Sequence, residues 1–189
     1  MDHCLVILAG DFIGLTSRSN AWSLLKAFVQ NAYDDPKVYQ LNVALFDMAF
    51  EPYDPITTAA HVLHDPLFGN PVKDILMWYS IGDCLVSNIT TELVARTMGI
   101  ESVKAPWQLA PRLGAFDSGV VVFDDHPTPL PPDTNEPPPT DNGTHSGINS
   151  KPAALRMVES FLLSPQKATE GCLVGGSPAP CDCATGACD

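Results

Sequence analysis

Hydrophobic positions along this chain follow two different patterns. Residues 4–10 (CLVILAG), 74–80 (DILMWYS) and 119–125 (GVVVFDD) form near-continuous apolar runs, which are typical of strands buried on both faces of a parallel sheet. Other segments carry apolar residues at the spacing of an amphipathic helix; they are residues 19–33, 35–50, 87–100 and 150–164. Because strands and helices alternate, the pattern predicts an α/β fold with a parallel sheet and flanking helices.

Capping and breaking residues indicate where the predicted helices begin and end. Ser19 or Asn20 is expected to cap the first helix, and Pro36 to lie in the first turn of the second. Gly99 is expected to end the third. Prolines break the segment after the second helix into a short helix and loops. We therefore expect residues 20–71 to form a helical cap beside the sheet, lining an apolar pocket.

Size and charge limit the classes of protein to which the chain can belong. With 189 residues, of which 45% are hydrophobic, it has the length of about one domain and is apolar enough to fold. Its formal net charge of -12 argues against nucleic acid or an anionic membrane surface as a partner. No apolar run approaches the roughly 20 residues that a membrane span needs, so no membrane span is expected.

The two ends of the chain carry separate signals. The start, MDHCLVILAG, has no basic n-region, so it predicts a buried strand and not a secretory signal. The domain is expected to cover residues 1–165, followed by a Cys-rich tail at 166–189 that holds four of the six cysteines. Two disulfides would order such a tail, which places a longer parent protein in an extracellular or periplasmic compartment. A zinc site and a tail with free thiols are the alternatives.

Acidic residues stand where two of the predicted strands end. Asp83 follows the second apolar run, Asp124 and Asp125 end the third, and His145 lies in a GTHSG turn before the last helix. The carboxyl ends of parallel strands meet at one edge of a sheet, where α/β proteins build their sites. An Asp that orients a His fixes its tautomer and stabilises the imidazolium, as acyl transfer requires. Asp83 and His145 are therefore the candidate catalytic residues.

The segment ILMWYSIGDCLVSNITTELVARTMGI, together with the later GTHSG turn, resembles the C-terminal half of a serine α/β-hydrolase. The nearest likeness is to secreted esterase- and lipase-like proteins of bacteria. It covers residues 4–163 and is sharpest at 75–99 and 143–163. In that family the chain order is nucleophile, acid, histidine.

The resemblance implies particular roles for residues of this chain. Asp83 matches the triad acid in a G-D-x-x-V turn, with Gly82 and Val86 in the flanking positions, and His145 matches the triad histidine. It also implies a partial α/β-hydrolase-type parallel sheet and no cofactor. The expected activity is hydrolysis of a small-molecule ester or lactone.

One part of the family pattern, the G-x-S-x-G nucleophile elbow, is missing from the sequence. The nearest match, GGSPA, places Ser177 in the Cys-rich tail after both candidate partners, and the serine next to His145 is a poor candidate. The interpretation drawn from this gap is truncation, with the nucleophile and the first strands upstream of Met1. A sheet lacking those strands has an unpaired edge, through which a homodimer can form.

A second hypothesis keeps the same region but uses a metal. Acidic residues gather between residues 112 and 151 without any Lys or Arg, and Asp124, Asp125 and His126 are adjacent there. Carboxylate oxygens suit Ca²⁺, and His ligands favour Zn²⁺. A metal-activated water would then open an ester or lactone, including a lactone of the acyl-homoserine type. An acidic Pro-rich loop at 126–142 is also commonly only solvated.

Two further readings remain open. His61 and His64 are three residues apart and can share one side of a short helix as metal ligands, but a helix-end or surface position is the expected one. The whole chain can also be a non-catalytic fragment or binding module. That hypothesis predicts no hydrolysis under any condition.

Overall fold

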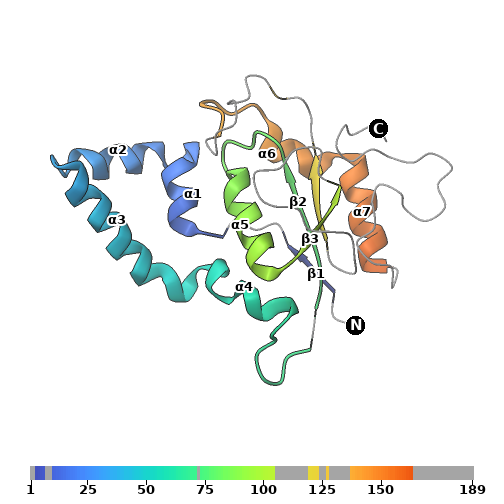
Figure 1. Ribbon diagram of the computed structural model, residues 1–189. Helices are drawn as coiled ribbons and strands as arrows, with labels where there is room; N and C mark the ends of the chain where they lie inside the picture. The colour runs from blue at the N-terminus through green and yellow to red at the C-terminus, as the bar shows by residue number, and fades with distance from the viewer. Residues whose placement is uncertain are drawn as a thin grey trace.

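The computed structural model describes residues 3–6, 10–71, 73–104, 119–123, 127 and 137–163. Within them the chain has a mixed α/β fold built on a four-stranded sheet of order β1-β2-β4-β3, in which every neighbouring pair is parallel. Figure 1 shows this sheet with helices on both sides. The strands are β1 (His3–Val6), β2 (Asp74–Ser80), β3 (Glu101–Lys104) and β4 (Gly119–Phe123).

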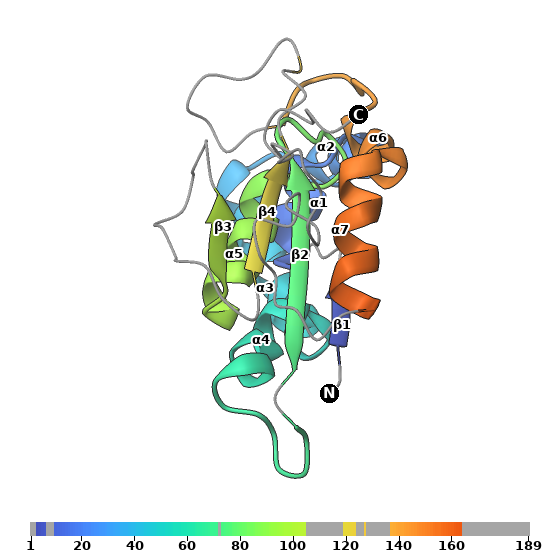
Figure 2. The same cartoon turned by 90° about the vertical axis from the view of Figure 1, so that its right-hand side faces the viewer.

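Strand β2 lies inside the sheet, between β1 and β4. Its side chains alternate between two hydrophobic clusters. Leu76 and Trp78 pack with residues of α7 (Pro152–Leu163), while Met77 and Tyr79 pack with residues of α5 (Asn88–Met98). Figure 2 shows α5 and α7 on opposite faces of the sheet. The continuous apolar run of the sequence is explained by this, because both faces of the strand are covered.

The helices between β1 and β2 form an insert, which Figure 1 shows as an arc to one side of the sheet. They are α1 (Phe12–Arg18), η1 (Asn20–Trp22), α2 (Ser23–Asn31), α3 (Pro36–Phe50), η2 (Glu51–Tyr53) and α4 (Pro55–Leu63). Only α4, which packs on α5, contributes a fully buried side chain from this insert, Ala59. These helices overlap the 20–71 region expected to form a cap, and its role as a cap stays a prediction. The short helices α6 (Thr144–Gly147) and η3 (Ile148–Ser150) come after β4, before α7.

Most of the predicted helix ends are confirmed. Ser19 caps η1, where its side chain accepts a hydrogen bond from the Ala21 N–H, and α2 follows directly. Helix α3 begins at Pro36, and α5 ends at Gly99, whose φ of 73° is left-handed. A glycine meets this φ without the steric cost that a Cβ would bring.

Helix α1 was not predicted, because its stability comes from distant residues. Its sequence, FIGLTSR, contains Gly, Thr and Ser, which are weak helix formers. The carboxylate of Asp54 accepts hydrogen bonds from the N–H groups of Asp11 and Phe12, about forty positions away, and also caps α4 through the Ile56 N–H. Asp11 in turn caps α1 at the Gly14 N–H. One buried acid thus fixes the starts of two helices.

Other expectations differ from the structure or lie outside it. Strand β3 was missed because ESVK is short and half polar, as suits a strand at the edge of a sheet. The last strand ends at Phe123, and residues 124–126 lie outside the described residues, as does the Cys-rich tail at 166–189. The tail disulfides therefore stay a prediction.

Strand β1 forms one edge of the described sheet. The expected homodimer through an exposed edge is consistent with this position but is not tested by it. Among the helices in the described parts of the chain, none combines the length and the apolar character that crossing a membrane requires.

Candidate active site

The turn after β2 positions Asp83. Gly82 has a left-handed φ of 79°, and the Ile81 N–H donates to the Phe123 carbonyl at 2.8 Å, so the turn lies beside the end of β4. Asp83 Oδ1 accepts two hydrogen bonds, from the N–H groups of Leu85 at 2.8 Å and Val86 at 2.9 Å. These bonds occupy one carboxylate oxygen and fix the plane of the carboxylate, which leaves Oδ2 to face outward from the turn.

Asn88, the first residue of α5, holds this turn in shape. Its Nδ2 donates to the Ser80 carbonyl at 2.7 Å, and its Oδ1 accepts from the Gly82 N–H at 2.9 Å. Asn88 is 7% exposed, so both bonds are made away from solvent. One amide side chain therefore joins the end of β2, the turn and the start of α5.

His145 lies on α6 (Thr144–Gly147), and Asn142 connects that short helix to the Asp83 turn. Asn142 Nδ2 donates to the Gly82 carbonyl at 3.0 Å, and its Oδ1 accepts from the Thr144 N–H at 3.0 Å. Segments sixty residues apart in sequence are thus joined by a single side chain. As a result, the start of α6, which carries His145, is held at a fixed position relative to Gly82, the residue before Asp83.

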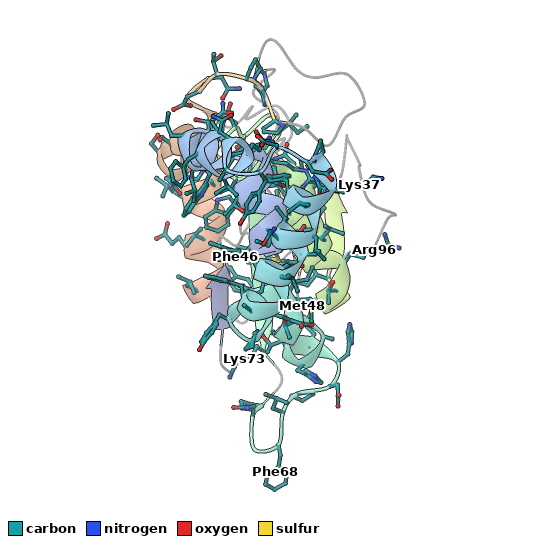
Figure 3. All side chains as sticks on the ribbon, turned by 90° about the vertical axis from the view of Figure 1, so that its left-hand side faces the viewer. Lys37, Phe46, Met48, Phe68, Lys73 and Arg96 are labelled. Atoms are coloured by element: carbon teal, nitrogen blue, oxygen red, sulfur yellow. The ribbon has the colours of Figure 1, made fainter. Side chains whose placement is uncertain are left out.

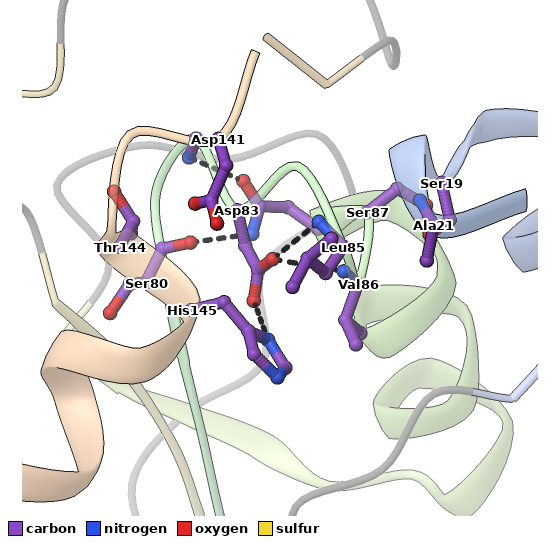
Figure 4. Close-up of polar contacts among 12 residues, drawn as sticks. Ser19, Ala21, Ser80, Asp83, Leu85, Val86, Ser87, Asp141, Thr144 and His145 are labelled. Atoms are coloured by element: carbon purple, nitrogen blue, oxygen red, sulfur yellow. Dashed lines mark hydrogen bonds and ion pairs between the residues drawn. The ribbon is translucent and has the colours of Figure 1, made fainter. Parts of the chain in front are cut away.

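Asp83 and His145 form a direct pair, as Figure 4 shows. His145 Nδ1 lies 2.8 Å from Asp83 Oδ2, with the side chains 34% and 10% exposed. A carboxylate at Nδ1 places the neutral ring's proton on that nitrogen and leaves the Nε2 lone pair available. Within the described residues, no hydrogen bond to Nε2 competes for it. The pair therefore has the arrangement of a general base with its orienting acid.

A second Asp-His pair in the same chain provides a comparison. His61 Nδ1 lies 3.2 Å from Asp65 Oδ2, but these two are one helical turn apart, and their side chains are 40% and 82% exposed. His61 Nδ1 also lies 2.9 Å from the Asp65 carbonyl. Exposed pairs of this kind are weakly held. His61 and His64 lie at the surface, the position expected for them. The two paired His side chains are about equally exposed, and the Asp83-His145 pair differs in its acid, which is 10% exposed and held by two backbone N–H groups.

The helical insert is hydrogen-bonded to the loop after Asp83. The Asn20 N–H donates to the Cys84 carbonyl at 2.9 Å, and Asn20 Nδ2 donates to the Pro138 carbonyl at 3.1 Å. The Cys84 thiol is fully buried. Burial and the carboxylates of Asp141 and Asp83 raise the pKa of Cys84, which keeps it a neutral thiol and a poor nucleophile at neutral pH.

The structure brings together two of the five residues named from the sequence. Asp83 and His145 are in contact, whereas Asp124, Asp125 and His126 lie outside the described residues. Among the residues that are described, no group of three or more His, Cys, Asp or Glu side chains can hold a metal ion. The metal site therefore stays a prediction.

Sequence reasoning missed Asn88 and Asn142 as structural parts of the site. Each has a signal in the sequence, because each is an Asn within a few residues of a Gly or Asp at a turn, where Asn amides bond to the backbone. What the sequence does not contain is the partner, since Asn142 bonds to Gly82 across the fold.

Comparison with known proteins gives no relative: no protein-family model, curated protein or solved structure matches this chain.

Proposed function

We propose that this chain is a hydrolase of carboxylic ester bonds, in esters or lactones, with Asp83 and His145 as its general-base pair. The observation that carries the proposal is the 2.8 Å contact between His145 Nδ1 and a carboxylate that is itself held by two backbone N–H groups. An acid can orient His145 only if it stays in one position, and the two backbone hydrogen bonds hold the Asp83 carboxylate in place. The partial α/β-hydrolase-type sheet expected from the resemblance belongs to the same proposal.

In the proposed reaction, His145 Nε2 takes a proton from the oxygen that attacks the carbonyl carbon of the substrate. The imidazolium that forms is stabilised by Asp83 Oδ2, and the proton then passes to the departing alcohol oxygen. In a lactone the departing oxygen stays attached to the product. The ring nitrogen that faces Asp83 keeps its proton throughout.

The attacking oxygen is the open part of this scheme, because the sequence has no G-x-S-x-G elbow. We assign it to a water molecule or to a hydroxyl group of another polypeptide segment. In the second case the acyl group is first transferred to that hydroxyl, and a water molecule that gives its proton to His145 Nε2 then releases the acid and returns the proton to the hydroxyl oxygen. A fluorophosphonate probe separates these cases, since it labels an activated serine and leaves a water-based mechanism unaffected.

The test is turnover of p-nitrophenyl butyrate and of a small lactone by the full chain. His145→Ala and Asp83→Asn are each expected to lower the rate by about 10²- to 10⁴-fold, the usual contribution of a positioned acid-base group. The exposed pair supplies matched controls, His61→Ala and Asp65→Asn, which are expected to leave the rate unchanged. Equal rates in His145→Ala and His61→Ala would exclude the assignment.

A further inference from the structure

The insert contains a cavity whose lining includes neither Asp83 nor His145. It has a volume of about 340 Å³ and lies among α1, α2 and α3, which is within the range of about 300–1,000 Å³ found for small-molecule sites. We propose that this cavity binds a medium-chain aliphatic carboxylate, independently of the Asp83-His145 pair.

Most of the lining comes from α2 and α3, and α1 adds Ile13, Thr16 and Ser17. Trp22, at the end of η1, continues the α2 stripe of Leu25, Lys26 and Val29, and α3 contributes Tyr39, Asn42, Val43 and Phe46. Within each stripe, neighbours are three or four residues apart, so they share one side of the helix. The two stripes face each other across the cavity, and most of their side chains are apolar.

Neither helix has enough protein cover for its apolar side chains. No residue of α2 or α3 is fully buried, and Leu25 and Phe46, both in the lining, are 49% and 50% exposed. Figure 3 faces this side of the molecule, with Phe46 labelled on α3. A ligand with an apolar body would cover this surface and remove it from water, which favours binding.

Charge selects the head group of the ligand. The chain has 22 acidic and 10 basic residues, yet the cavity is lined by one Lys and no Asp or Glu. Lys26 Nζ donates one hydrogen bond to the Ser17 carbonyl at 2.9 Å, and an ammonium has three donors. Lys26 Nζ therefore has donors left with which it can bind the carboxylate of a ligand in the cavity.

The volume sets the length of the apolar body. Taking each methylene as about one water volume, roughly 30 Å³, a cavity of 340 Å³ holds a chain of about ten carbons. Affinity is expected to rise about three- to fourfold for each added methylene up to that length. Longer chains are expected to gain nothing further.

The test is isothermal titration calorimetry of the full chain, which measures its affinity for octanoate, decanoate, dodecanoate and 1-decanol. Val43→Phe narrows the cavity and is expected to weaken decanoate binding by at least about tenfold, the loss of two buried methylenes. The matched control is Val38→Phe on the same helix, because Val38 does not line the cavity. It is expected to bind decanoate as the unaltered chain does.

The head group has its own pair of variants. Lys26→Gln is expected to weaken decanoate by about two- to fivefold, as suits a partly exposed ion pair, and to leave 1-decanol binding unchanged. Lys37→Gln, on the far side of α3 from Phe46 as Figure 3 shows, is the control. Because these variants keep the cavity open, they test the proposal even if Val43→Phe does not fold.

Several outcomes would overturn the proposal. They are undetectable decanoate binding, equal affinity for every chain length, equal loss in Lys26→Gln and Lys37→Gln, or concentration-dependent dimers that disappear in Val43→Phe without any decanoate binding. The last result would assign this surface to a second copy of the chain. His145→Ala is expected to bind decanoate normally, so failure of the hydrolase proposal leaves this test intact.

Discussion

Replacing Asn88 by Ala should loosen the turn that holds Asp83 and destabilise the whole fold. Asn88 bonds to the Ser80 carbonyl and the Gly82 N–H, and all three residues are buried. Leaving a buried backbone group without a partner costs about 1–3 kcal/mol. The Gly82 N–H loses its partner, whereas the Ser80 carbonyl still accepts from the Asp83 N–H at 3.4 Å. The expected loss in the free energy of unfolding is therefore about 1–3 kcal/mol, against the 5–15 kcal/mol typical of a domain.

Urea unfolding followed by circular dichroism measures this loss, with Asn70→Ala as the control. Asn70 lies in an exposed loop, and its replacement is expected to change stability by less than about 0.5 kcal/mol. Without urea, the folded Asn88→Ala variant should also turn over the ester more slowly, because the turn no longer fixes the Asp83 carboxylate. If the two Asn variants unfold at the same urea concentration, Asn88 does not hold the turn and the reasoning fails.

Three other predictions concern Asp47, Cys84 and the predicted metal ligands. Slight desolvation and three neighbouring carboxylates raise the pKa of Asp47, whose side chain is largely exposed. Its ionisation therefore costs a little stability as the pH rises through the unfolded value near 4. Asp47→Asn should raise Tm slightly at pH 7 and leave it unchanged at about pH 2.5. Cys84, buried and with a raised pKa, should escape iodoacetamide in the folded chain at pH 8 and react after unfolding, as peptide mass mapping would show; alkylation of the folded chain at the unfolded rate would contradict this. If Asp124, Asp125 and His126 hold a catalytic metal, dialysis against a chelator should abolish turnover and Ca²⁺ or Zn²⁺ should restore it, whereas an Asp-His mechanism without metal ignores the chelator.

The main strands could be predicted from the sequence because burial on both faces leaves an unambiguous pattern. Strand β2 is a continuous apolar run, and its end at Ser80 is followed at once by Gly82 and Asp83. The edge strand β3 could not be predicted, because its sequence, ESVK, is short and half polar. Helix α1 could not either, since the Asp54 carboxylate, which accepts from the N–H groups at its start, lies beyond two further α-helices in the sequence.

The two residues of the candidate site could be predicted from the sequence, but the contact between them could not. Asp83 and His145 stand out because each interrupts a regular pattern at a strand end or a Gly-flanked turn. Their separation of 2.8 Å depends on Asn142, which has no periodic pattern and whose partner, Gly82, lies sixty residues away. The local sequence does not show which residue a single polar side chain bonds to across the fold.

The central claim is that Asp83 and His145 act as one unit, and a double-mutant cycle of ester turnover tests it most directly. Because Asp83 acts through the imidazole, the double variant Asp83→Asn/His145→Ala is expected to lose no more activity than His145→Ala alone. Losses that multiply in the double variant, or no loss in either single variant, would contradict the account.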